Sequence, residues 1–221
     1  MIVFKKDKNK FIFFRNNKPI KTNSDLNVYV KNINHAKIFI EEFSDKNKNK
    51  DQYSNLNLTN FACDLNEKDI AEIIENLLKH INFDLIIYRS FDDKELISSL
   101  DKHLNIFLNT FNKEFKTQLK VISNMNQKSI EINKERFENY LKELDIFKLS
   151  IIYKLSGITK SVVLSYFFLE KKISCKQLFK LTNIENNFQQ KKWGYVDEQK
   201  KNDAYVNEIL NKISFFLKII I

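Results

Sequence analysis

Three side chains of different chemistry stand four residues apart near the end of the sequence: the acid Glu185, the amide Gln189 and Trp193, the only tryptophan. This spacing places all three on one face of a helix. Gly194 follows, and a glycine after a helix often closes the last turn in a left-handed conformation. One interpretation is a helix end with the indole packed inward. An acid, an amide and an indole are an unusual mixture for a core, however, and they suit a surface that binds another protein.

The sequence lacks the motifs of most enzymes. With only two glycines, the chain cannot form a phosphate-binding loop, a dinucleotide fingerprint or a nucleophile elbow. The histidines, His35, His80 and His103, are far apart, and none has a histidine or cysteine three or four residues away. The paired acids, Glu41–Glu42 and Asp92–Asp93, fall at expected helix ends, where they serve the helix dipole or face solvent. We therefore expect no enzyme, no cofactor and no metal.

The cysteines and the apolar runs bear on cellular location. Cys63 and Cys175 are isolated, which is typical of a reducing compartment rather than of a disulfide framework. The first residues show no secretory signal or transit peptide. The apolar runs fall short of the ~20 residues that span a bilayer. We expect a cytoplasmic, bacterial-type protein that does not insert into a membrane.

The formal net charge of +9 makes nucleic acid an alternative partner. Only three of the 37 basic residues are arginines, however, and proteins that bind phosphates favour arginine for its bidentate fork. We favour an AT-rich coding sequence as the source of the lysines and expect no specific nucleic-acid binding. Phe188 and Tyr195 could stack on bases, but we favour the interpretation that they seal the end of a helix.

The first sixty residues have the pattern of a small β-rich module. The apolar run 11–14 and the alternating segment 26–30 predict strands, and the segment 16–19 between them predicts a turn. Asn34 is a candidate cap for a helix that buries Ile38, Phe39 and Phe43. The lysine and asparagine tract 44–52 predicts a solvated loop.

From Asp64 onward the apolar residues recur with a helical period. Helices are expected from a cap at Asn66, over 92–115, from near Asn133, over 146–169 and over 197–217. The segment 84–89 is expected to be a connector or a short strand, and the segment 119–123 another extended piece. Gly157 is the expected position of a kink or break in the long apolar helix 146–169. A capping box at Ser174–Gln177 predicts the helix that leads to Trp193.

Five segments, in the same order, resemble the ATP twelve-type chaperones of F(1)-ATPase assembly. The segment 181–194 is similar to the family's C-terminal signature, which ends in tryptophan and glycine. The segments 11–22, 56–62, 83–89 and 155–164 are similar to its opening strands, a proline-leucine-threonine segment, a tyrosine-arginine segment and an apolar helix. The sequence departs from the family at Asn186, where a second acid is usual, and at 104–106, near the place where a tryptophan-aspartate-proline piece is usual.

The resemblance implies an α+β protein with a small β-rich N-terminal domain (1–62) and a larger helical C-terminal domain (63–221). Such proteins bind the free α subunit of the ATP synthase catalytic head until β subunits replace them, without hydrolysing nucleotide. We expect a monomer whose partner-binding residues are Glu185, Gln189 and Trp193, with Gly194 shaping the turn. Tyr88 and Arg89 are second candidates, and core packing is the alternative role for Tyr88.

Overall fold

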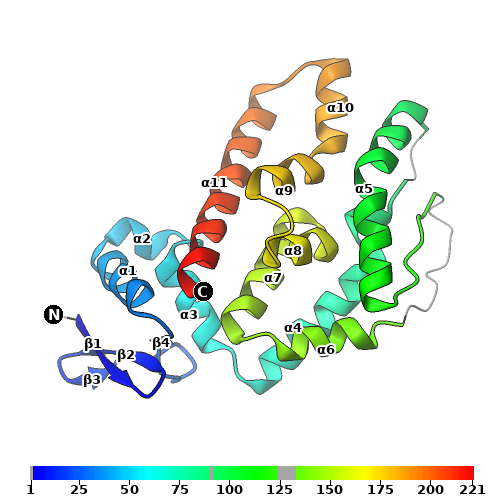
Figure 1. The fold of residues 1–221 in the computed structure, drawn as a ribbon. Coiled ribbons are helices and arrows are strands. Elements are labelled where there is room, and N and C mark those ends of the chain that lie inside the picture. The colour runs from blue at the N-terminus through cyan, green and yellow to red at the C-terminus, as the bar shows by residue number, and fades with distance from the viewer. Residues whose placement is uncertain (1, 90–91, 124–132) are drawn as a thin grey trace. The chain divides into compact units, whose positions relative to one another are not determined.

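The computed structural model describes residues 2–89, 92–123 and 133–221. An antiparallel sheet at the N-terminus is followed by a mostly helical region, which confirms the predicted α+β class (Figure 1). The chain divides into two compact units. Unit 1 comprises Met1–Ile70, Asp145–Ile151 and Ile209–Ile221, and unit 2 comprises Ala71–Leu144 and Ile152–Glu208. The division into domains at residues 62 and 63 stays a prediction.

The sheet of unit 1 is built around strand β2. Its strands are β1 (Ile2–Asp7), β2 (Lys10–Arg15), β3 (Lys18–Pro19) and β4 (Tyr29–Val30). β2 pairs antiparallel with each of the other three, with Val3 opposite Phe14 and Ile12 opposite Tyr29. Asn16 and Asn17 have positive φ angles of 51° and 62°, as the two-residue turn between β2 and β3 requires. The predicted turn 16–19 is therefore present over Asn16 and Asn17 only, since Lys18 and Pro19 form β3, and the predicted strand 26–30 is confined to its last two residues.

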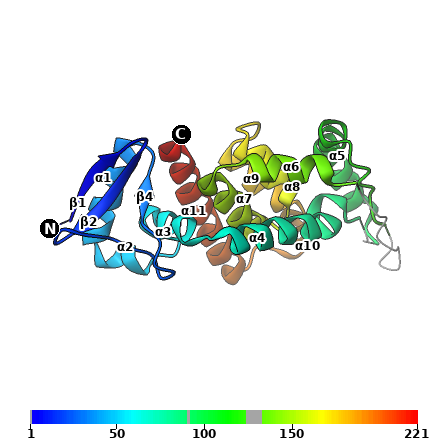
Figure 2. The same cartoon turned by 90° about the horizontal axis from the view of Figure 1, so that it is seen from below.

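Three helices complete the N-terminal part of unit 1: α1 (Ile33–Ser44), α2 (Lys46–Lys50) and α3 (Asn55–Asp64). Phe13 of β2 stacks on Phe39 of α1 with 4.1 Å between ring centroids, and Figure 2 shows α1 beside β1 and β2. The cap of α1 is Asn32 and not Asn34, because the Asn32 side chain accepts a hydrogen bond from the His35 amide. The predicted loop 44–52 contains α2, whose first turn is capped by Asp45.

Eight α-helices follow in the described part of the chain, and α4, α7 and α11 supply residues to both units. They are α4 (Glu67–His80), α5 (Lys94–Phe115), α6 (Glu135–Glu143), α7 (Ile146–Thr159), α8 (Val162–Leu169), α9 (Cys175–Thr182), α10 (Ile184–Trp193) and α11 (Asp197–Ile220). The predicted cap at Asn66 and the capping box at Ser174–Gln177 are both present. In unit 2, Phe111, Phe137 and Tyr166 form the centre of an aromatic core.

The long apolar segment 146–169 is broken three residues after the expected position. Gly157 lies inside α7, and the break falls at Lys160, which has a φ angle of +55°. Ser161 then caps α8 by accepting a hydrogen bond from the Leu164 amide. The side-chain hydroxyl of Thr159 contacts both Ser161 and Ser165 in the buried space at the break. These contacts stabilise a turn with a positive φ angle at Lys160, a residue type that does not predict such a turn.

Candidate functional site

Helix α10 carries three of the predicted partner-binding residues, Glu185, Gln189 and Trp193. The Gln189 amide nitrogen donates a hydrogen bond to Glu185 Oε1 at 3.1 Å, which holds two of them together on one face. The Trp193 side chain is 76% exposed. The interpretation in which the indole packs inward is therefore wrong, and the helix presents it to solvent.

Gly194 ends α10 through its backbone geometry. Its amide donates to the Gln190 carbonyl at 2.9 Å, and its φ and ψ angles are 88° and 165°. The positive φ agrees with the expectation, but ψ is extended rather than left-handed helical. This combination is accessible essentially only to glycine. The requirement at residue 194 is thus for glycine itself.

Asp203 of α11 holds the connection that follows Gly194. Its carboxylate accepts hydrogen bonds from Tyr195 Oη at 2.7 Å, from Gln199 at 2.7 Å and from Gln190 at 3.3 Å. These three donors come from α10, the connection and α11. They fix the end of α10 where Trp193 is exposed. Tyr195 is itself 43% exposed, so the interpretation that it seals the helix end is also wrong.

A hollow of about 540 Å³ in unit 2 brings together two predicted residues, Glu185 and Tyr88. We call it the Glu185 hollow. Its apolar lining includes Leu100, Leu181, Ile184 and Val206, and Asn183, Asn186 and Asn202 contribute amide groups. A largely apolar hollow with a few polar groups that set orientation is typical of a binding site. Gln189, Trp193, Gly194 and Arg89 are not part of its lining.

Arg89 is buried, and its donors are used inside unit 2. Its guanidinium donates to Asp101 Oδ1 at 3.0 Å, to the Ile86 and Tyr88 carbonyls at 2.8 Å each and to Asn105 at 3.3 Å. Its side chain is 2% exposed, whereas that of Asp101 is 43% exposed. Arg89 therefore fixes the backbone on which Tyr88 stands, and Tyr88 is half-buried at the Glu185 hollow.

Asp84 fixes the other end of the same segment. Its buried carboxylate accepts hydrogen bonds from the amides of Ile86 at 3.1 Å and Val163 at 3.0 Å. Burial raises the pKa of Asp84 to about 6, and the hydrogen bonds from Ser161, Val163 and Ile86 oppose that rise. The Leu85 amide also donates to the Lys160 carbonyl at 2.9 Å. The segment 84–89, expected to be a connector or a short strand, forms a short helical turn over Leu85–Ile87, followed by a bridge from Tyr88 to Ile122.

Several residues of the Glu185 hollow escape sequence reasoning. Leu85, the turn at residues 158–160, and Asn202 and Val206 of α11 come from separate segments of the chain. Their spacing in sequence carries no common period, so no local pattern groups them. For Asn183 the sequence offers one indication, its position between the expected helix and Trp193. In the structure it separates α9 from α10, with φ and ψ angles of −109° and 19°.

The Glu185 hollow and the exposed Trp193 offer apolar area with a few polar groups, as a binding surface does. Over residues 2–89, 92–123 and 133–221, no three side chains of His, Cys, Asp or Glu gather as a metal site would need. In the same ranges no helix has the length and apolarity that crossing a membrane requires. Glu185, which lines the Glu185 hollow, and the exposed Trp193 lie on the same helix, α10.

No family model matches the chain, and no curated protein matches it in sequence. Solved structures do match. Atp12 from Paracoccus denitrificans matches with a TM-score of 0.83 and 15% identity, over 100% of this chain and 96% of that chain. An aspartate-to-lysine mutant of that protein matches with a TM-score of 0.83 and 15% identity, over 100% of this chain and 95% of that chain. Atu1473 from Agrobacterium tumefaciens, described as a candidate chaperone, matches with a TM-score of 0.83 and 16% identity, over 98% of this chain and 83% of that chain. The chain therefore has the Atp12 fold from end to end.

Proposed function

We propose that this chain, which has the Atp12 fold, is an assembly chaperone of the ATP synthase catalytic head. It binds the free α subunit and shields its interface until β subunits take its place, without catalysis of its own. The observation that carries the proposal is the match of the whole chain to Atp12 at a TM-score of 0.83. The five ordered sequence segments that resemble the same family give independent support.

The proposed contact surface is the exposed side of α10 together with the Glu185 hollow. An unpartnered α subunit exposes apolar interface that would otherwise aggregate. Trp193 supplies a large anchor, and Glu185 and Gln189 supply polar groups beside it. A surface with few anchors and a polar surround suits a complex that must form and later dissociate.

Tyr88 and Arg89 have different roles in this proposal. Tyr88 lines the Glu185 hollow, so its side chain is available to the client. Arg89 is 2% exposed and acts by positioning Tyr88 through its bond to the Tyr88 carbonyl. Gly194 likewise acts by shaping the end of α10 rather than by contact.

Affinity capture tests the proposal. Tagged chain expressed in its own host should co-purify with the ATP synthase α subunit. Glu185→Lys should lower the recovered α subunit at least tenfold, because it places a cation where the client meets an acid. Glu198→Lys is the matched control, since Glu198 is exposed on α11 in the same unit and lies outside the Glu185 hollow. Absence of the α subunit from the unaltered capture would refute the proposal.

A nucleic-acid-binding protein is the second candidate, and charge distribution is the observation in its favour. Residues 1–31 contain eight lysines or arginines and only two aspartates. That function predicts micromolar or tighter binding to arbitrary duplex or single strand that weakens steeply with salt. A gel-shift titration at two salt concentrations distinguishes it from the chaperone, for which we expect no such binding.

A further inference from the structure

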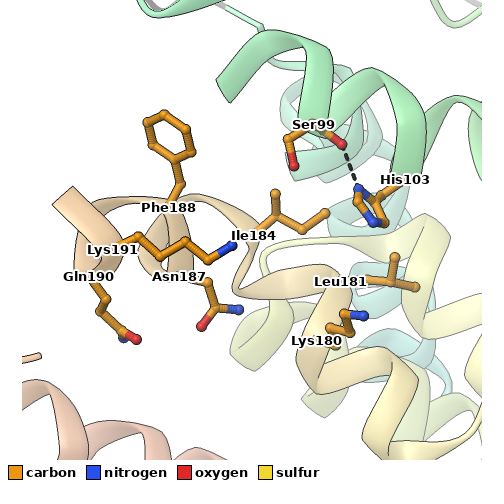
Figure 3. A pocket seen from close by; sticks show the side chains of 9 residues that line it. All are labelled: Ser99, His103, Lys180, Leu181, Ile184, Asn187, Phe188, Gln190 and Lys191. Atoms are coloured by element: carbon orange, nitrogen blue, oxygen red, sulfur yellow. Dashed lines mark hydrogen bonds between the residues drawn. The ribbon is translucent and has the colours of Figure 1, made fainter. Parts of the chain in front are cut away.

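A second hollow in unit 2, of about 520 Å³, lies along α10 (Figure 3). We call it the His103 hollow. Its apolar wall is formed by Leu181, Ile184 and Phe188, and Leu181 and Ile184 also line the Glu185 hollow. The two hollows therefore share a wall.

The polar groups of the His103 hollow are cationic or neutral. Lys180 of α9, Lys191 of α10 and His103 of α5 line it together with Ser99, Asn187 and Gln190. Figure 3 shows the Lys191 side chain running from α10 toward Ile184. The described lining contains no carboxylate, and within the described ranges neither lysine forms an ion pair. Other lysines of unit 2, such as Lys172 and Lys192, do have carboxylate partners.

The tautomer of His103 follows from its hydrogen bond. Nδ1 lies 2.7 Å from the Ser99 carbonyl oxygen, which can only accept, so Nδ1 carries the hydrogen. Nε2 is then the ring nitrogen left for a ligand. It accepts a hydrogen bond when the ring is neutral and donates one when the ring is protonated.

We propose that the His103 hollow binds a carboxylate side chain of the client, with a neighbouring apolar side chain packed against Leu181, Ile184 and Phe188. The inference rests on the proposed function. Two observations favour a client segment over a free small anion: the hollow shares a wall with the Glu185 hollow, and the two hollows differ in charge. A segment that crosses the shared wall would meet Glu185 together with Lys160 on one side, and on the other side two lysines without a carboxylate, which fixes its direction.

Zero-length carbodiimide cross-linking tests the proposal, because it joins a carboxylate only to an amine in direct contact. In the purified complex of the full chain with the ATP synthase α subunit, mass spectrometry should find an amide bond from Lys180 or Lys191 to an aspartate or glutamate of the α subunit. An apolar residue should lie within a few positions of that acid. Complex formation with cross-links only at other lysines would overturn the inference and leave the proposed function intact.

Charge reversal gives an independent readout. The double variant Lys180→Glu/Lys191→Glu should weaken binding of the α subunit at least tenfold. Lys113→Glu/Lys201→Glu, which makes the same charge change at exposed positions of unit 2 outside both hollows, should change it less than threefold. Equal effects of the two double variants would overturn the inference, because they would indicate general electrostatics. The milder pair Lys180→Gln/Lys191→Gln, which should still weaken binding, replaces the reversal if that variant does not fold.

A titration with inorganic phosphate addresses the free-anion source. We expect millimolar phosphate to leave binding of the α subunit unchanged beyond its effect on ionic strength. Tight phosphate binding that abolishes capture only when Lys180 and Lys191 are present would assign the hollow to a small anion and overturn the inference. If the unaltered chain does not bind the α subunit at all, the proposed function fails, and this inference fails with it.

Discussion

Trp193 differs in exposure from the large aromatic side chains that form the core of unit 2. Phe111 and Phe137 are fully buried, whereas Trp193 is 76% exposed at the end of α10. An indole in that position contributes little to folding, because most of its apolar area stays in water. The same area becomes favourable when a partner covers it. At the residue scale, Trp193 should therefore contribute much to binding and little to the stability of the fold.

Trp193→Ala tests this separation. We expect the free energy of unfolding to change by less than about 0.5 kcal/mol, as at other exposed positions. Binding of the α subunit should weaken by about 2 kcal/mol or more, the cost of losing an interface anchor. Denaturant unfolding and a binding titration on the same protein give both values. A large loss of stability would show that the indole packs within the chain.

Arg89 should give the opposite result. Arg89→Ala leaves the Ile86 and Tyr88 carbonyls without their donor and removes the partner of Asp101. We expect a loss of about 2–4 kcal/mol in the free energy of unfolding, measured by denaturant titration. Asp101→Ala is the comparison and should cost less, because Arg89 keeps its hydrogen bonds to the Ile86 and Tyr88 carbonyls and to Asn105. Equal losses would contradict the role given to the buried carbonyl contacts.

At the element scale, the break before α10 and its end at Gly194 decide what the helix presents. Asn183 separates α9 from α10, and its side chain donates to the Phe179 carbonyl at 2.9 Å. Gly194 then turns the chain into the connection that Asp203 holds. The exposed surface of α10 thus depends on two backbone positions and on one carboxylate of α11.

The two glycines form a natural test pair. In both cases an added Cβ would meet nothing within 4 Å, so only the backbone conformation differs. Gly194→Ala should destabilise by about 1–3 kcal/mol, because alanine is strained at a φ of 88°. Gly157→Ala, inside α7, should stabilise by up to about 1 kcal/mol. Thermal unfolding measures both, and the same sign of change in the two variants would contradict the assignment.

Local signals predicted many helix boundaries. Asn66 and the Ser174–Gln177 capping box cap helices as predicted, because the hydrogen bonds that they make lie within a few residues. Two other boundaries differ from the prediction. Asn32 rather than Asn34 caps α1, and its side-chain amide also donates to the Ile219 carbonyl, far away in the sequence. The break at Lys160, where φ is positive, depends on buried hydroxyl contacts among Thr159, Ser161 and Ser165. The sequence shows three hydroxyl residues there but not that they are buried together.

The candidate site was predictable only where it lies on one element. The spacing of Glu185, Gln189 and Trp193 gave their common helix, because helix geometry follows from sequence distance alone. The hollows are assembled from several segments, and Tyr88 meets Glu185 only through the tertiary fold. Burial of Arg89 could not be read from its neighbours, since arginine is seldom buried unless its charge is paired.

At the scale of the whole molecule, two buried groups, His35 and Asp84, make the free energy of unfolding depend on pH in opposite directions. Burial lowers the pKa of His35 to about 4, from 6.5. Between those values the unfolded chain binds a proton that the folded chain does not, so stability is lost as pH falls from 6.5 toward 4. Asp84 acts with the opposite sign: its pKa of about 6 in the folded chain exceeds its ordinary value of 3.8, so it adds stability as pH falls through 6.

The His35 contribution can be isolated with His35→Gln, which keeps a side chain able to hydrogen-bond Thr59. The unfolding free energy of the unaltered chain, minus that of the variant, should fall by up to about 3 kcal/mol between pH 7 and pH 4. Urea unfolding at a series of pH values measures this difference. A difference that stays constant over the range would show that His35 is protonated equally in both states.

The central claim is that the chain holds the free α subunit until β subunits replace it. Titration of purified β subunit into the purified complex of this chain with the α subunit tests that claim most directly, with light scattering to follow complex mass. The account predicts a complex with one copy of each protein that releases this chain as α pairs with β. No complex with the α subunit, or a complex that persists at saturating β subunit, would contradict it.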